Sequence, residues 1–248
     1  MIKGIFSSAA GMLPRTLKLE IIANNIANID TTGFKKDNAF IQVMDHAKVT
    51  AFNQSGVGDL AGLDAKEFTD FSQGTFRTTH NSFDMALLGK GFFTIETPQG
   101  TRYTRNGNFS LAPDGSIQTQ QGYAVIGTSG PIKIAGLNKL STADISISQE
   151  GEIVVDKTVV GKLRIVDFPE PYKLEKFGNS FFAPKDNIAP TDAEKDTVVR
   201  QGMLEESNVD AIFEMISMIE LSNGYESVQK LTQIQDGSLG AAMDVGRI

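Results

Sequence analysis

The sequence predicts an α+β protein in which a mainly antiparallel β domain, like a barrel or sandwich, is inserted between N- and C-terminal helices that form coiled coils. Two observations predict this class. Apolar residues repeat at alternating spacings of three and four near both ends, which is typical of helices that pack lengthwise on other helices. In the middle of the chain the apolar period changes to two, and turn residues recur every eight to twelve positions.

The expected organisation has four parts. An N-terminal helical arm spans residues 1–36, an extended connector spans 37–76, an antiparallel β domain spans 77–204, and a C-terminal arm that packs with the first spans 205–248. No stretch approaches the roughly 18 apolar residues of a membrane-spanning helix, so membrane insertion is not expected. The first residues lack the apolar run and cleavage site of a secretory signal, so we assign them to the first helix.

The N-terminal arm carries an apolar seam over nearly four heptads. Pro14 removes one helix hydrogen bond, so we expect either a bend there or a regular helix that starts there. The helix should end near Asp30–Thr32, where Gly33 can adopt the left-handed conformation that closes a helix. Its asparagines either fix the register between helices or mark a simple helix exit. The predicted interface residues are Ile2, Ile5, Ala9, Met12, Leu19, Ala23, Asn24, Asn25, Ile26 and Asn28.

The C-terminal arm has a matching pattern. Ser207 can cap a helix whose third residue is Asp210, a variant of the capping box. Glu205 and Glu206 suit the positive end of the helix dipole. Farther along, the apolar stripe drifts around the helix surface. The predicted interface residues of this arm are Val209, Ile212, Ile216, Ile219, Leu221, Tyr225 and Val228.

Charge distinguishes the two arms. Residues 1–36 carry a net charge of +3 and residues 205–248 a net charge of −6, which favours pairing of the arms within a chain or between chains. The alternative is that each stripe belongs to an ordinary core helix. The whole chain has a net charge of −7, which argues against nucleic acid as a partner.

Turn signals divide the predicted β domain. Asn106–Gly107 is the strongest hairpin signal in the chain, and Asp114–Gly115 is a second one. Pro98–Gly100 marks another turn. Of the neighbouring rings of Phe92 and Phe93, we expect one in the core and one at an interface.

The sequence predicts no catalytic residue, no cofactor and no metal site. It has no cysteine and only two histidines, in different surroundings, which excludes the usual zinc sites. A β-fold enzyme or binding module acting on cell-wall carbohydrate is a remote alternative, which would need paired carboxylates. The candidate carboxylates are Asp84, Glu96 and Asp114, and positions on a turn or on a strand face explain them without a catalytic role. Arg102 and Arg105 could bind a carboxylate or a sugar, but cross-strand charge pairing explains them better.

Three motifs, in order along the chain, carry a family resemblance. Ala23–Asn28 followed by Thr31–Lys35 resembles the N-terminal signature of bacterial flagellar axial proteins. Gly89–Phe93 with Tyr103–Phe109 resembles the middle motif of the rod and hook subgroup, and Gln201–Val209 resembles its third motif.

The resemblance implies a structural subunit of the flagellar basal-body rod, used for motility and without enzymatic activity. It implies self-assembly through the terminal helices, with other rod and hook subunits as partners and the β domain as the outer layer. It also implies export by the flagellar type III apparatus, without a cleaved signal peptide, to the periplasm-spanning rod. The short middle resembles rod rather than hook, and the ending Asp244–Ile248 favours the proximal over the distal rod. A distal-rod or hook subunit is the alternative.

Overall fold

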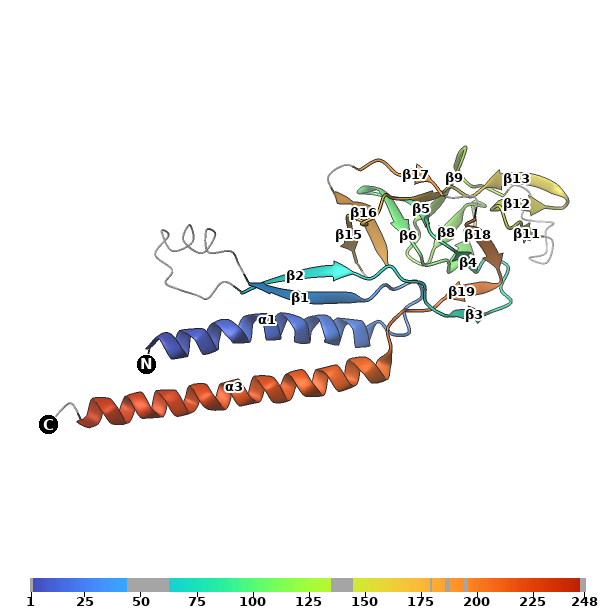
Figure 1. The fold of residues 1–248 in the computed structure, drawn as a ribbon. Coiled ribbons are helices and arrows are strands. Elements are labelled where there is room, and N and C mark those ends of the chain that lie inside the picture. Colours follow the sequence, from blue (N-terminus) through green and yellow to red (C-terminus); the bar gives the residue numbers. More distant parts are fainter. Residues whose placement is uncertain are drawn as a thin grey trace. The chain divides into compact units, whose positions relative to one another are not determined.

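The computed structural model describes residues 2–43, 63–134, 145–178, 180–185, 188–193 and 196–245. The chain divides into two compact units (Figure 1). The helical unit comprises residues 1–27, 36–71 and 209–248, and the β unit comprises residues 28–35 and 72–208. Within the described ranges, no helix is long and apolar enough to cross a membrane.

The helical unit is built around α1 (Ile2–Ala27). This helix contacts α3 (Ala211–Val245) and also the antiparallel pair β1 (Asp37–Val43) and β2 (Leu63–Thr69). In Figure 1, α1 lies between that strand pair and α3, and the two helices run in opposite directions.

The proline in α1 does not begin the helix. A regular helix starting at Pro14 was one of two expectations, and it is wrong because α1 starts at Ile2 and continues through Pro14. Pro14 is buried, so packing of its ring offsets part of the hydrogen bond that it removes.

The region expected as an extended connector, residues 37–76, contains the β1–β2 pair. The register joins Asp37 to Thr69 and Val43 to Leu63. The paired segments are far apart in sequence and residues 44–62 between them lie outside the described part, so short-range periodicity gave no sign of this pairing.

The caps of the helices differ from the expected ones. Asp210, not Ser207, caps α3: its Oδ1 accepts hydrogen bonds from the backbone N–H groups of Ile212 at 2.9 Å and Phe213 at 3.1 Å. After α1, Gly33 has the predicted left-handed conformation, with φ +68°. The helix itself ends earlier, at Ala27.

The β unit contains antiparallel sheets, and with the terminal helices this confirms the α+β class. The largest sheet has the order β15-β16-β6-β5-β9-β8-β7, with β10, β14 and β17 paired alongside. The others are β11-β12-β13 and the pairs β18-β4 and β19-β3. The bounds are β3 (Phe76–Thr78), β4 (Met85–Leu88), β5 (Phe92–Thr97), β6 (Gly100–Thr104), β7 (Phe109–Leu111), β8 (Ile117–Thr119), β9 (Ala124–Gly127), β10 (Gly130–Pro131), β11 (Ile145–Ile147), β12 (Glu152–Val155), β13 (Thr158–Lys162), β14 (Ile165–Asp167), β15 (Leu174–Phe177), β16 (Phe181–Pro184), β17 (Thr191–Asp192), β18 (Val198–Gln201) and β19 (Met203–Glu205).

Two of the three predicted hairpins are present, and the third, at the strongest turn signal, is wrong. Pro98–Gly100 joins the paired strands β5 and β6, and Asp114–Gly115 joins β7 and β8. Asn106–Gly107 does not form a hairpin, because β6 and β7 pair with other strands. Gly107 is required for a close approach: a Cβ there would lie 1.6 Å from the carbonyl oxygen of Met85.

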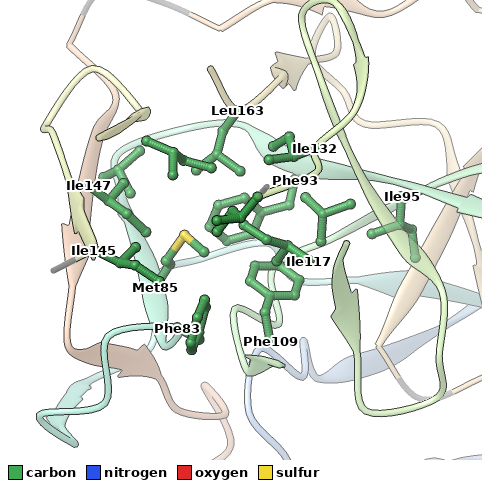
Figure 2. Close-up of a cluster of buried hydrophobic side chains, with 14 of the residues drawn as sticks. Phe83, Met85, Phe93, Ile95, Phe109, Ile117, Ile132, Ile145, Ile147 and Leu163 are labelled. Atoms are coloured by element: carbon green, nitrogen blue, oxygen red, sulfur yellow. The ribbon is translucent and has the colours of Figure 1, made fainter. Parts of the chain in front are cut away.

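The core of the β unit is apolar and draws on most of its strands. Phe93, Met85 and Ile117 are fully buried in it, and Figure 2 shows these side chains pointing toward one another. Phe92 is also buried, on the other side of β5, where its ring packs edge-on against Phe182. The expectation that one of the two neighbouring phenylalanines lies at an interface is therefore wrong.

Candidate assembly interface

Helix α3 has two faces of different character. On one face of α3, half-buried side chains repeat at heptad spacing. The same helix contacts α1. Leu221, Tyr225 and Val228 from the predicted interface belong to this series. Its members are Met218, Leu221, Tyr225, Val228, Thr232 and Gln235.

The second face of α3 is apolar and exposed. Ile212 is 72% exposed, Ile216 51% and Ile219 61%. At about 100° per residue, these positions lie roughly half a turn from the half-buried series. What the sequence shows as one drifting stripe is therefore two stripes, of which only one is covered. We call the exposed one the α3 stripe; it comprises Ile212, Phe213, Met215, Ile216, Ile219, Leu231 and Ile234.

The predicted interface residues of α1 differ in exposure. Met12, Leu19 and Ile26 are half-buried, whereas Ala23 and Asn24 are exposed. The side chains of Ile2, Ile5 and Ala9 lie outside the described residues. Val209, predicted for the other arm, is buried.

Asn25 fixes α1 to the strand pair. Its amide donates a hydrogen bond to the carbonyl oxygen of Asp37 at 2.8 Å, and its Oδ1 accepts one from the Asp37 N–H at 3.0 Å. Asn25 is buried, so this reciprocal pair sets the position of β1 along the helix. Asn28 instead belongs to the turn after α1, where its carbonyl oxygen accepts a hydrogen bond from the Thr31 N–H at 3.1 Å.

The strand pair carries two exposed aromatic rings. Phe40 and Phe68 are each about half exposed, and their ring centroids are 6.1 Å apart. In the register, Phe40 lies opposite Lys66 and Phe68 opposite Asn38, so both rings are on the same face of the pair. Sequence reasoning did not find these residues, because the pairing that brings them together was not predicted.

In the β unit, the segment after α1 is held by a buried ion cluster. Lys35 Nζ lies 2.7 Å from Glu205 Oε1, and Arg105 Nη1 lies 3.4 Å from Glu205 Oε2. The side chains of Lys35 and Glu205 are 1% and 0% exposed. Lys35 also donates to the carbonyl oxygen of Ser72 at 2.6 Å. One carboxylate thus neutralises two cations that are out of contact with water.

The backbone of this segment is held by further hydrogen bonds. The Gly33 N–H donates to the carbonyl oxygen of Glu205 at 2.8 Å, and Thr32 Oγ1 donates to Asn106 Oδ1 at 2.9 Å. Lys176 Nζ donates to the Lys35 carbonyl oxygen at 2.6 Å. A Cβ at Gly33 would lie 2.4 Å from the backbone nitrogen of Asn106, so only glycine fits this approach.

Arg105 joins this cluster to the aromatic residues around Phe92. Its guanidinium lies 5.3 Å from the centre of the Phe92 ring, and Nη2 donates to the Gly89 carbonyl oxygen at 2.8 Å. Burial lowers the pKa of Arg105, and the charge of Glu205 opposes that shift. Cross-strand pairing was expected for this arginine and is wrong: Arg105 follows β6, and its carboxylate partner Glu205 lies on β19, which pairs with β3.

Three regions of the chain match known protein families, and each region contributes one residue to the buried ion cluster. Residues 11–35 match the family described as flagella basal body rod protein. Residues 86–155 match the flagellar hook protein FlgE/F/G D1 domain, and residues 200–245 the flagellar basal body rod FlgEFG protein C-terminal. Lys35, Arg105 and Glu205 each come from a different one of these regions.

Whole proteins align over most or all of the chain. The flagellar basal-body rod protein FlgG of Bacillus subtilis is 31% identical over 100% of both chains. The flagellar basal-body rod protein FlgF of Caulobacter vibrioides is 31% identical over 86% of this chain and 85% of its own. The chain belongs to the flagellar basal-body rod protein family. As a rod protein it is a structural subunit of the basal body and not an enzyme.

The carboxylates considered for chemistry have structural surroundings in this rod protein. Asp84 is buried and accepts a hydrogen bond from Asn81 Nδ2 at 3.2 Å. Asp114 accepts hydrogen bonds from Ser116, which lower its pKa. Glu96 is exposed on β5. Among the described residues, no group of three histidine, cysteine or acidic side chains is placed to hold a metal ion.

Proposed function

We propose that this rod subunit assembles through its paired terminal helices, with the α3 stripe packed against neighbouring axial subunits. The observation that carries the proposal is the exposure of Ile212, Ile216 and Ile219 on the side of α3 away from the half-buried series. A contiguous exposed apolar surface is typical of a protein–protein contact site.

The energetic scale supports assembly. Fully burying one aliphatic side chain of this size stabilises by about 1.5–3 kcal/mol. Ile212, Ile216 and Ile219 are 51–72% exposed, so covering several such residues gives free energy that opposes the entropy lost in joining a polymer. The predicted interface residues Leu221, Tyr225 and Val228 have a different role in this proposal, because they hold α3 to α1 within the subunit.

The test is a charge placed in the stripe. We expect Ile216→Glu or Ile219→Glu to abolish rod assembly in cells that lack the native chain. Gln229→Glu, at an exposed position of α3 outside the stripe, should assemble normally. Electron microscopy of basal bodies measures assembly, and thermal unfolding of the purified chains shows that each variant folds. Normal rods from both stripe variants would contradict the proposal.

Export and position in the axis belong to the same proposal. The subunit leaves the cell through the flagellar type III apparatus without a cleaved signal peptide, and it occupies the proximal rod. Relatives named FlgF and FlgG match over most of their length, which supports a rod position. Deleting residues 2–30 should abolish secretion, and a cryo-EM map of the native basal body assigns the position. An intact N-terminus on the secreted protein is expected, and a shortened one contradicts uncleaved export.

A further inference from the structure

The helical unit has a second uncovered apolar surface besides the α3 stripe. It consists of Phe40 and Phe68 on the outer face of the strand pair, and we call it the Phe40/Phe68 platform. In Figure 1, α1 separates the strand pair from α3. The platform and the α3 stripe therefore lie on opposite sides of one helix and cannot cover each other within a single chain.

We propose that the Phe40/Phe68 platform receives the α3 stripe of a second copy of this chain. This inference rests on the proposed function, because it names the surface against which the stripe packs. A contact between two different surfaces of identical subunits is heterologous, and a heterologous contact that does not close produces an open helical filament. A rod subunit needs such a pair of surfaces, and the described part of the helical unit exposes large apolar side chains only on these two.

The shapes of the two surfaces fit this docking mode. The stripe presents side chains at spacings of three and four, as in helices that bind apolar grooves. The platform rings are tilted at 55° to each other and lie diagonally across the strand pair, with Lys66 beside Phe40 and Asn38 beside Phe68 on the same face. Aromatic rings and aliphatic side chains give large buried areas in such contacts.

Charge complements the apolar contact. The exposed Lys66 lies directly opposite Phe40 in the strand register. On α3, Glu220 is exposed and is the residue after Ile219, so it lies at the edge of the α3 stripe. The C-terminal arm as a whole is acidic, with a net charge of −6 over residues 205–248. Opposite charges beside an apolar contact set its orientation and exclude a reversed arrangement.

The absence of cysteine from the sequence gives a direct experiment. Cells lacking the native chain would produce two variants as separate chains, one with Phe68→Cys and one with Ile219→Cys. Basal bodies built from this mixture would be treated intact with a mild oxidant. Two introduced thiols join only where their Cβ atoms approach to about 3.5–4.5 Å. We expect a cross-linked dimer from the mixture, monomers from each variant alone, and a ladder of multimers from a chain carrying both substitutions.

Matched controls exclude random collision. Glu67→Cys changes the neighbour of Phe68 on the same strand, and Gln229→Cys is exposed on α3 outside the stripe, so neither should cross-link with the opposite partner. Dimers of Ile219→Cys alone would show a stripe-to-stripe contact, and dimers of Phe68→Cys alone a platform-to-platform contact. Either result, or the absence of cross-links in assembled rods, overturns this inference while leaving the proposed function intact.

A charge-reversal experiment tests the proposed contact even if the cysteine variants fail to build rods. We expect Lys66→Glu and Glu220→Lys each to lose rod assembly, and the chain carrying both to recover it. No recovery in the combined variant, or no loss in either single variant, overturns the inference. Normal rods from both Ile216→Glu and Ile219→Glu contradict the proposed function itself, so the two failures are distinguishable.

Discussion

Replacing Glu205 by glutamine is the most informative change to the β unit. It keeps the size of the side chain and removes the charge that neutralises Lys35 at 2.7 Å and Arg105 at 3.4 Å. These side chains are 1%, 0% and 6% exposed for Lys35, Glu205 and Arg105, so water cannot replace the lost carboxylate. Breaking a buried ion pair in this way costs about 3–5 kcal/mol. We expect a loss of that size in the free energy of unfolding.

Two companion variants calibrate the result. Lys35→Met leaves Glu205 paired with Arg105 and with the Gly74 N–H at 3.1 Å, so we expect a smaller loss of about 1.5–3 kcal/mol. Glu206→Gln is the matched control, because Glu206 pairs with Arg77 at 3.1 Å on the surface. An exposed pair contributes less than about 1 kcal/mol.

The assay is urea unfolding of the full chain, followed by far-UV circular dichroism and by tyrosine fluorescence. Combining Lys35→Met with Glu205→Gln should cost less than the sum of the single changes, because the two side chains interact directly. Equal losses for Glu205→Gln and Glu206→Gln would refute the reasoning that the buried cluster holds residues 31–35 in the β unit.

Three further changes test separate features of the structure. Gly107→Ala should destabilise the β unit by about 3 kcal/mol, since its Cβ would meet the Met85 carbonyl oxygen at 1.6 Å; urea unfolding measures this, and an unchanged midpoint contradicts it. Asp210→Ala should cost about 1 kcal/mol of helix stability by removing the α3 cap, seen as faster amide exchange over the first turn of α3, and unchanged exchange there argues against the cap. Burial and Asp167 raise the pKa of Tyr172 well above its usual range, so the folded protein keeps this proton after the unfolded chain has lost it. Stability should therefore fall as the pH rises through about 10, and less so in Tyr172→Phe; an ordinary titration of Tyr172 by ultraviolet absorbance would exclude this.

The sequence predicts those features that depend on neighbouring residues. The periods of the two arms and of the middle segment predict helices and strands because a helix or strand face repeats within a few positions. The Asp114–Gly115 hairpin is predicted for the same reason. The Asn106–Gly107 hairpin fails because the glycine serves a close approach to Met85, a residue distant in the chain.

Features that depend on distant residues were not predictable in this way. Glu205 looks like a charge for the helix dipole, yet it is buried with Lys35, which is 170 positions away. One signal was available in the sequence: each of the three motifs contains one residue of the cluster, Lys35, Arg105 or Glu205. The Phe40/Phe68 platform gave no signal, because its strand pairing joins segments separated by residues 44–62.

The drifting stripe of α3 shows how one helix can hide two surfaces. Read along the sequence, Ile219 and Leu221 look like one imperfect seam. The structure separates them: Ile219 is exposed and Leu221 lies in the half-buried series. A helix that is apolar on two sides must cover both, and one chain covers only one of them.

A cryo-EM map of rods assembled from this chain tests the central claim most directly. We predict that the side chains of Ile212, Ile216 and Ile219 are buried against a neighbouring subunit. Rods in which these three side chains face solvent would contradict it.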